Sequence, residues 1–140
     1  IPHIVKKIER QDSLDRRFYE RHYTKVDPKH FEPIVDGMWR GVNVGGTSTA
    51  ARLEGLDVCG KTGTAENPRG RDHSTFLSFA PKDNPKIAIS VYVENGGFGA
   101  SAALPIASLL EEYYLTDTIR RPALLEHIKN MNIYYPSYDR

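Results

Sequence analysis

The residues best suited to chemistry in this sequence are Gly60-Lys61-Thr62-Gly63-Thr64, near the middle of 140 residues. In an extended segment the side chains alternate between two faces, so Thr62 and Thr64 project the same way. Two hydroxyls with a lysine beside them suit an incoming carboxylate, and Gly63 leaves room for a peptide laid alongside the strand. Unpaired backbone N–H groups on such an edge can pair with an extended substrate or stabilise an oxyanion. We therefore expect residues 60–64 to form a carboxylate-binding strand edge.

The same lysine belongs to a second pattern, because residues 55–62 (GLDVCGKT) fit the phosphate-binding loop G-x-x-x-x-G-K-[ST]. A phosphate loop needs a buried strand before its first glycine and a helix that opens at the Lys-Thr pair. Here no β-branched run precedes Gly55, and Leu56 and Val58 alternate like a strand inside the expected loop. Pro68 would break a helix soon after it began. Nucleotide binding is therefore the less favoured interpretation.

Composition narrows the classes of function. Nineteen basic and eighteen acidic residues leave a formal net charge of +1, so we expect no nucleic-acid partner. The single cysteine, Cys59, excludes an internal disulfide and is best interpreted as a buried structural thiol. No apolar run approaches the roughly 20 residues of a membrane-spanning helix. His22 and His30 fit no metal-ligand spacing, so we expect neither a metal site nor a cofactor.

Hydrophobic spacing predicts the elements that must position the lysine and threonines. Strands are expected over residues 3–9, 17–25, 56–65, 75–80 and 86–94, and helices over about 32–43, 101–115 and 122–130. Ser101 is the expected N-cap of the second helix. In that helix the residues spaced to cover the sheet are Leu104, Ala107, Leu110 and Tyr114. Short connections between the last three strands imply a meander, so the predicted fold class is α+β: an antiparallel β-sheet with packed helices.

Lys61-Thr62-Gly63-Thr64 on the first strand of a meander that ends in a helix resembles the penicillin-interacting serine enzymes. In that superfamily K-T-G is a signature beside S-x-x-K and S-x-N. The segments 2–8 (PHIVKKI), 60–66 (GKTGTAE), 73–76 (HSTF), 79–81 (FAP) and 95–99 (NGGFG) look like the C-terminal part of a class B penicillin-binding protein. They are most similar to the cell-elongation type, penicillin-binding protein 2. The resemblance covers about residues 1–115 of the transpeptidase domain, and residues 116–140 are expected to form a tail with a possible short helix.

The resemblance implies an activity and a role for each matching residue. Members of this family are D,D-transpeptidases, which cross-link peptidoglycan stem peptides through an acyl-enzyme on serine and are acylated by β-lactams. By resemblance, Lys61 organises the proton network around the nucleophile, and Thr62 and Thr64 hold the terminal carboxylate of the peptide or β-lactam. The backbone N–H of Thr64 is the implied oxyanion donor, and Gly63 keeps the strand edge open. The implied location is the periplasmic face of a bacterial inner membrane, with the anchor upstream and the cell-elongation machinery as a possible partner.

The nucleophile that this activity requires is missing from the sequence. None of the eight serines is followed by lysine three residues on or by asparagine two residues on. We therefore expect a fragment that is inactive alone and that needs the upstream part of the same domain. Two further interpretations stay open besides the phosphate loop. One is a serine β-lactamase or β-lactam sensor domain, which shares the K-T-G strand, and the other is a non-catalytic module in which Lys61–Thr64 is an ordinary strand.

Overall fold

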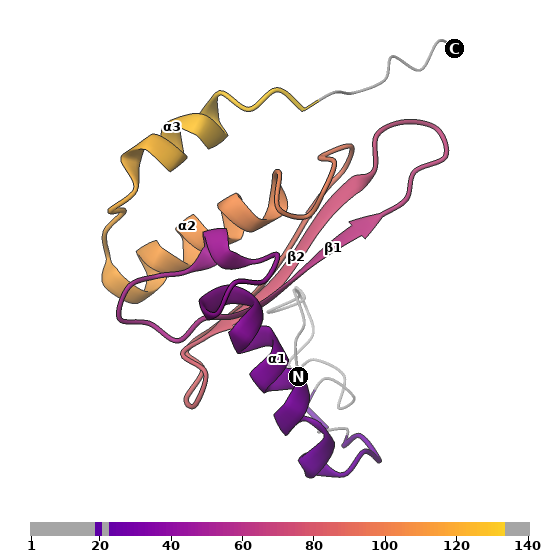
Figure 1. The fold of residues 1–140 in the computed structure, drawn as a ribbon, viewed down its shortest axis with the longest axis vertical. Coiled ribbons are helices and arrows are strands. Elements are labelled where there is room, and N and C mark those ends of the chain that lie inside the picture. Colours follow the sequence, from indigo (N-terminus) through magenta and orange to yellow (C-terminus); the bar gives the residue numbers. More distant parts are fainter. Residues whose placement is uncertain (1–18, 21–22, 134–140) are drawn as a thin grey trace, which may run out of the picture.

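The computed structural model describes residues 19–20 and 23–133 (Figure 1). Its elements are η2 (Pro28–His30), α1 (Glu32–Asn43), η3 (Thr49–Ala51), β1 (Cys59–Ala65), β2 (His73–Ala80), β3 (Ile87–Val93), α2 (Ala103–Thr116) and α3 (Pro122–Lys129), where η marks a short 3₁₀ helix. Three antiparallel strands with packed helices confirm the predicted α+β class. No helix in these described ranges is long and apolar enough to cross a membrane.

The sheet is an antiparallel meander in the order β1-β2-β3, as the short connections predicted. Gly63 lies opposite Thr75 and Ser74 lies opposite Val93, and residues paired in this way share a face of the sheet. The first strand begins later than predicted, at Cys59, because residues 53–56 close a tight turn around Gly55, whose φ is +75°. Within the described residues, β1 and β3 are the two edges of the sheet.

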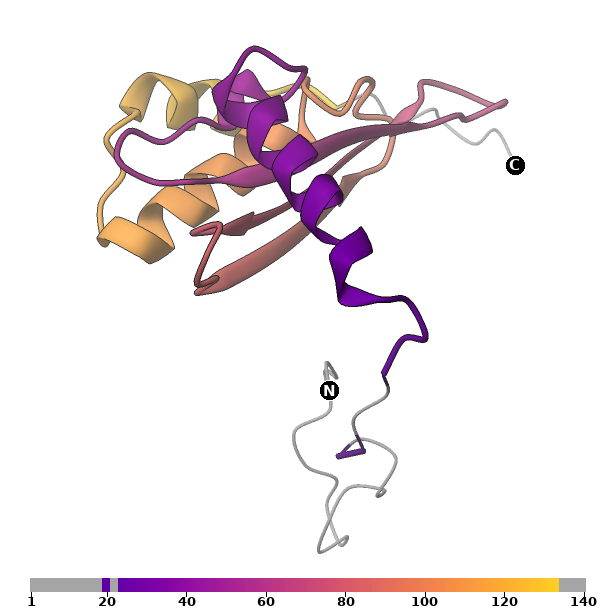
Figure 2. The same ribbon diagram turned by 60° about the horizontal axis from the view of Figure 1, so that its bottom comes forward.

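The core lies where α2 and the end of α1 meet one face of the sheet. Phe76 of β2 is fully buried, and Leu104 and Ala107 of α2 belong to the same cluster. Val42 from the last turn of α1 joins them, and Figure 2 shows α1 running steeply across the strands near the start of β1. Burial of a side chain such as Phe76 is worth about 1.5–3 kcal/mol relative to leaving it in water. This cluster therefore fixes the start of β1 against both helices.

The face that α2 turns to the sheet differs from the predicted one. Leu104 and Ala107 are buried as expected, but Leu110 is 51% exposed and Tyr114 is 59% exposed. An α-helix turns by about 100° per residue, so three residues from Ala107 to Leu110 leave it about 60° short of a full revolution. The stripe continues instead through Glu111, which is fully buried. The prediction followed the apolar residues and passed over a buried carboxyl.

The N-terminus of α2 is capped from another element. Ser101 was the expected cap, but Ala102 occupies the N-cap position and makes no side-chain hydrogen bond. The backbone N–H of Ala103 donates instead to Oγ of Ser74 on β2, at 2.9 Å. The prediction was wrong because a cap was sought only in the local sequence, whereas the sheet supplies this one.

The remaining helices agree with the sequence. α1 has the predicted bounds, and a short α3 follows Arg121. The predicted strand over residues 3–9 lies outside the described part of the chain. Among the described residues within 17–25 none forms a strand, and Tyr19 and Tyr23 are exposed to solvent.

Candidate functional site

The predicted site residues Lys61, Thr62, Gly63 and Thr64 lie within β1, on a sheet edge that no other described strand covers. Thr62 pairs with Phe76 and Thr64 pairs with Ser74, so the two threonines share a face, as their alternation predicted. Lys61 and Thr64 are exposed, and Thr62 and Gly63 are half-buried. Figure 1 shows the connection from β1 to β2 projecting beyond the helices, at the upper right.

The ammonium group of Lys61 stays close to this edge. Its Nζ donates a hydrogen bond to the backbone carbonyl of Thr62 at 2.6 Å. A lysine ammonium carries three donors and no acceptor, so two donors remain for another group. The arrangement places a positive charge and two hydroxyls along one short stretch of exposed strand, which is the chemistry that recognises a carboxylate.

Gly63 is required by its neighbour on β2 as well as by the open edge. A Cβ built at Gly63 would collide with Oγ1 of Thr75, the residue opposite it in the register. From the sequence alone, Gly63 was expected only to leave room for a peptide beside the strand. The structure adds a packing reason, since any side chain here would displace Thr75 or the strand itself.

The glycine-rich loop, residues 95–99, packs directly against the backbone of β1 and β2. A Cβ at Gly99 would lie 2.6 Å from the carbonyl oxygens of Gly63 and Thr75, so the loop backbone rests directly on the strand backbone. Oγ of Ser74 donates to the carbonyl of Phe98 at 2.8 Å and holds the loop in place. The glycines thus serve close backbone packing.

The connection from β1 to β2 is tied to the same loop. Oδ1 of Asp72 accepts from the backbone N–H of Asn67 at 3.1 Å, and the side chain of Asn67 donates to Oδ1 of Asn95 at 3.0 Å. The backbone N–H of Gly97 donates to the carbonyl of Asp72 at 2.8 Å. These bonds fix the far end of β1 in relation to the glycine-rich loop, and the edge is therefore supported along its length.

One residue at the site escaped the sequence analysis. Oγ1 of Thr47 lies 3.0 Å from Oγ1 of Thr62, within hydrogen-bond distance. Thr47 follows the Gly45-Gly46 pair just after α1. The only signal in the sequence was a polar residue just after that pair, because the contact joins residues fifteen positions apart.

The phosphate-loop alternative is contradicted by the backbone. Lys61 and Thr62 lie inside a strand, and β1 continues to Ala65 with no helix opening at the Lys-Thr pair. The first glycine of the pattern, Gly55, sits in the tight turn of residues 53–56 instead of following a buried strand. The backbone N–H groups of residues 55–62 are consequently not arranged around a phosphate.

Cys59 is the buried thiol that the sequence predicted. It is fully buried at the start of β1, and its Sγ lies 3.8 Å from the carbonyl of Val35 in α1. Burial raises the pKa of the thiol to about 11. A thiol with this pKa stays protonated near neutral pH, so Cys59 is a poor nucleophile.

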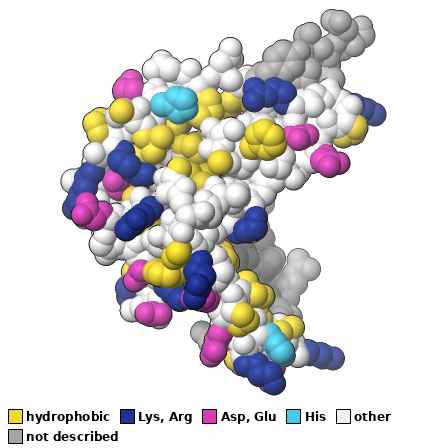
Figure 3. Space-filling view, in the orientation of Figure 1, with side chains coloured by type: hydrophobic (Ala, Val, Ile, Leu, Met, Phe, Trp, Pro, Cys, Tyr) yellow, Lys and Arg dark blue, Asp and Glu magenta, His cyan; other side chains and the backbone are white. Residues whose placement is uncertain are grey.

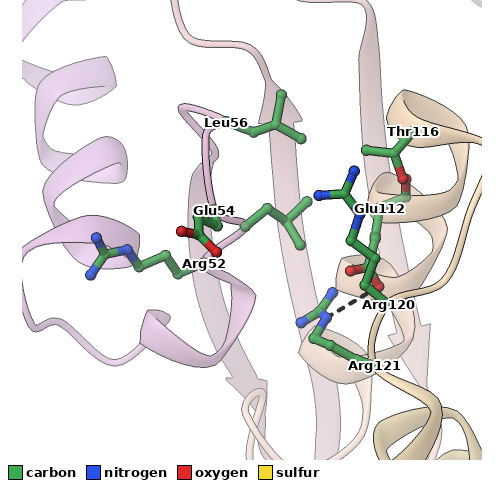
Figure 4. A pocket seen from close by; sticks show the side chains of 8 residues that line it. Arg52, Glu54, Leu56, Glu112, Thr116, Arg120 and Arg121 are labelled. Atoms are coloured by element: carbon green, nitrogen blue, oxygen red, sulfur yellow. Dashed lines mark hydrogen bonds and ion pairs between the residues drawn. The ribbon is translucent and has the colours of Figure 1, made fainter.

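A separate cavity of about 310 Å³ lies between the turn at Leu53 and the end of α2, and it contains none of the predicted residues (Figure 4). Nε of Arg121 bonds to Oε2 of Glu112 at 3.2 Å, and its Nη2 donates to the carbonyl of Ser108 at 3.0 Å. Both interactions engage Arg121 with groups of α2, so its side chain connects α2 to the segment that precedes α3. On the face of the molecule drawn in Figure 3 basic and acidic side chains are interspersed, in keeping with a net charge of +1.

Comparison with known proteins links this geometry to a family. A family model described as the penicillin binding protein transpeptidase domain matches residues 1–110. The peptidoglycan D,D-transpeptidase MrdA of Haemophilus influenzae is 36% identical over 106 residues, which cover 64% of this chain and 16% of the relative. The peptidoglycan D,D-transpeptidase PbpA of Mycolicibacterium smegmatis is 31% identical over 107 residues, which cover 72% and 21%.

A solved structure gives the same result. Penicillin-binding protein A from M. tuberculosis, in its imipenem acyl-enzyme complex, matches with a TM-score of 0.56 at 32% identity, over 65% of this chain and 20% of that one. The chain therefore spans about a fifth of the length of these relatives.

Proposed function

Because this chain belongs to the penicillin-binding protein transpeptidase domain family, we propose that it supplies the K-T-G strand of a peptidoglycan D,D-transpeptidase. The observation that carries the proposal is the open edge of β1, where Thr62 and Thr64 share a face beside Lys61. Peptidoglycan stem peptides are the substrates in this proposal. β-Lactams enter the same site as acylating inhibitors in this proposal, and the related structure is an imipenem acyl-enzyme complex.

Each group on the edge has a role in acyl transfer. The hydroxyls of Thr62 and Thr64 donate to the carboxylate at the end of the peptide. The ammonium of Lys61 supplies positive potential and helps to organise protons around the nucleophile. The backbone N–H of Thr64 stabilises the oxyanion of the tetrahedral intermediate, and loss of one such donor costs about 3–4 kcal/mol of barrier.

The nucleophile comes from outside these residues. No serine of the chain stands in an S-x-x-K pattern, so the upstream part of the domain supplies the serine that forms the acyl-enzyme and the base that activates it. On this proposal residues 1–140 alone are inactive. The site faces the periplasm at a bacterial inner membrane, where the cell-elongation machinery is the expected partner.

Labelling with a fluorescent penicillin tests the proposal in the intact protein that carries this chain. Lys61→Ala and Thr64→Val are expected to slow acylation about 10- to 100-fold, because each removes a hydrogen bond or charge offered to a carboxylate. Both residues are exposed, so the melting temperature should change little. Lys86→Ala is the matched control, since Lys86 is exposed in the β2–β3 turn, away from the edge.

Three outcomes would change the assignment. If acylation is unaltered in both variants, the assignment of the site to β1 is wrong. Covalent label on residues 1–140 alone would place the nucleophile within this chain. Rapid hydrolysis of the acyl-enzyme by the intact protein would identify a serine β-lactamase instead.

A further inference from the structure

Thr47 lies in the connection between α1 and β1, and its hydroxyl contacts the carboxylate-binding edge at Thr62. Its Oγ1 lies 3.0 Å from Oγ1 of Thr62, and either atom can be the donor. Thr47 is exposed and Thr62 is half-buried, so an incoming ligand can reach this pair. We propose that Thr47 is a positioning residue that orients the hydroxyl of Thr62 toward the substrate carboxylate. This inference rests on the proposed function of the β1 edge.

The loop that carries Thr47, residues 44–48, is held rigidly against α1. A Cβ at Gly46 would lie 2.6 Å from Cα of Gly41, so these two backbones are in direct contact. The backbone N–H of Ser48 donates to the carbonyl of Gly41 at 3.2 Å, and Ser48 is only 1% exposed. Gly45 has a φ of +112°, a conformation that favours glycine. The position of Thr47 is therefore set by packing rather than by its own exposed side chain.

The same helix end also holds β1. Nδ2 of Asn43 donates to the carbonyl of Val58 at 3.0 Å, just before the strand begins. A Cβ at Gly41 would lie 3.6 Å from the carbonyl oxygen of Gly60, which is ordinary contact distance. The last turn of α1 contacts both the loop and the strand. It therefore fixes the distance between Thr47 and Thr62.

Hydrogen-bond chemistry gives the contact a direction once a carboxylate is bound. A hydroxyl has one donor and two acceptor sites, whereas a carboxylate only accepts. Thr62 donates its single hydroxyl proton to the carboxylate. In the bound state Thr47 is therefore the donor of the hydrogen bond between the two threonines. This fixes the Thr62 hydroxyl in one orientation and polarises it, because successive hydrogen bonds strengthen one another.

The test compares two ligands that differ only in the carboxylate. Acylation rates of the intact protein are measured with benzylpenicillin and with its methyl ester. Thr47→Val should slow acylation by benzylpenicillin about three- to tenfold and leave the ester unchanged, which is the effect expected for one hydrogen bond. Thr47→Ser should restore the rate, since it keeps the hydroxyl. Thr49→Val, at a second exposed threonine, is the control and should change neither rate.

A double-mutant cycle with Thr62→Val separates positioning from general stability. Thr47→Val should cause no further loss once the Thr62 hydroxyl is gone. The inference is overturned by an unchanged benzylpenicillin rate, by an equal loss with acid and ester, or by additive losses in the cycle. If Thr47→Val does not fold, as judged by its melting temperature, Thr47→Ala answers the same question.

The two proposals fail in different ways. A slowed Thr62→Val beside an unaffected Thr47→Val overturns the role of Thr47 alone. An unaffected Thr62→Val overturns the carboxylate-binding role of Thr62, and the inference about Thr47 falls with it.

Discussion

Replacing Glu111 with glutamine should remove a pH dependence from the stability of the fold. Glu111 lies in α2 and is fully buried, and neither of its carboxyl oxygens has a hydrogen-bond partner among the described residues. Burial raises its pKa from 4.5 to about 7, against smaller opposing effects of Ser78 and Arg121. In the unfolded chain the carboxyl ionises freely in water, so folding must keep it protonated or bury a charge.

The sign and size of the effect follow from the two pKa values. Below pH 4.5 the carboxyl is protonated in both states and costs no stability through ionisation. Between pH 4.5 and about 7 only the unfolded state ionises, so the free energy of unfolding falls by 1.36 kcal/mol per pH unit, and it levels off at higher pH. The total loss is about 3 kcal/mol, a large part of the 5–15 kcal/mol that stabilises a typical domain.

The assay is denaturant unfolding of the intact protein and its Glu111→Gln variant from pH 4 to pH 8. The variant should match the wild type near pH 4 and exceed it by about 3 kcal/mol at pH 8, because glutamine does not ionise. Glu94→Gln, at an exposed position just after β3, is the matched control and should follow the wild type. Parallel curves for wild type and Glu111→Gln over the whole range would refute the reasoning.

Two further predictions concern the support behind β1. Ser74→Ala should lower the free energy of unfolding by about 1–3 kcal/mol, because it leaves buried backbone groups of α2 and the glycine-rich loop without their partner. Ser90→Ala, at an exposed position on β3, should have little effect, and equal losses in the two variants would argue against this role. Gly99→Ala should lower the melting temperature and slow penicillin acylation together, since its Cβ would press on the carbonyl oxygens of Gly63 and Thr75. A Gly99→Ala protein with normal values of both would show that the loop does not support the strand.

Elements with a regular apolar period could be predicted from the sequence alone. The spacing in residues 32–43 gave the bounds of α1, and the alternation of Ile87, Ile89, Val91 and Val93 gave β3, whose alternate residues are half-buried. The pairing of Thr62 and Thr64 on one face also followed from strand geometry. These features depend on neighbours in the sequence, which is why local reasoning was sufficient.

Contacts between distant segments could not be predicted in this way. The hydroxyl of Ser74 caps α2 from a separate strand, and Thr47 meets Thr62 across the end of a helix. Apolar spacing placed Leu110 on the buried stripe of α2, whereas Glu111 completes that stripe. Each case depends on tertiary packing that overrides local preference, and hydrophobic periodicity along the sequence does not indicate it.

The unpaired side of β3 has a practical consequence for anyone who produces these 140 residues by themselves. Among the described residues β3 pairs only with β2, so its other row of amide and carbonyl groups is paired with no further described strand. Such a row is a template on which a second molecule can add a strand, and Ile89 and Val91 would make the resulting ribbon apolar on one side. Self-association should therefore rise with concentration in the isolated polypeptide, and sedimentation at several dilutions would reveal it.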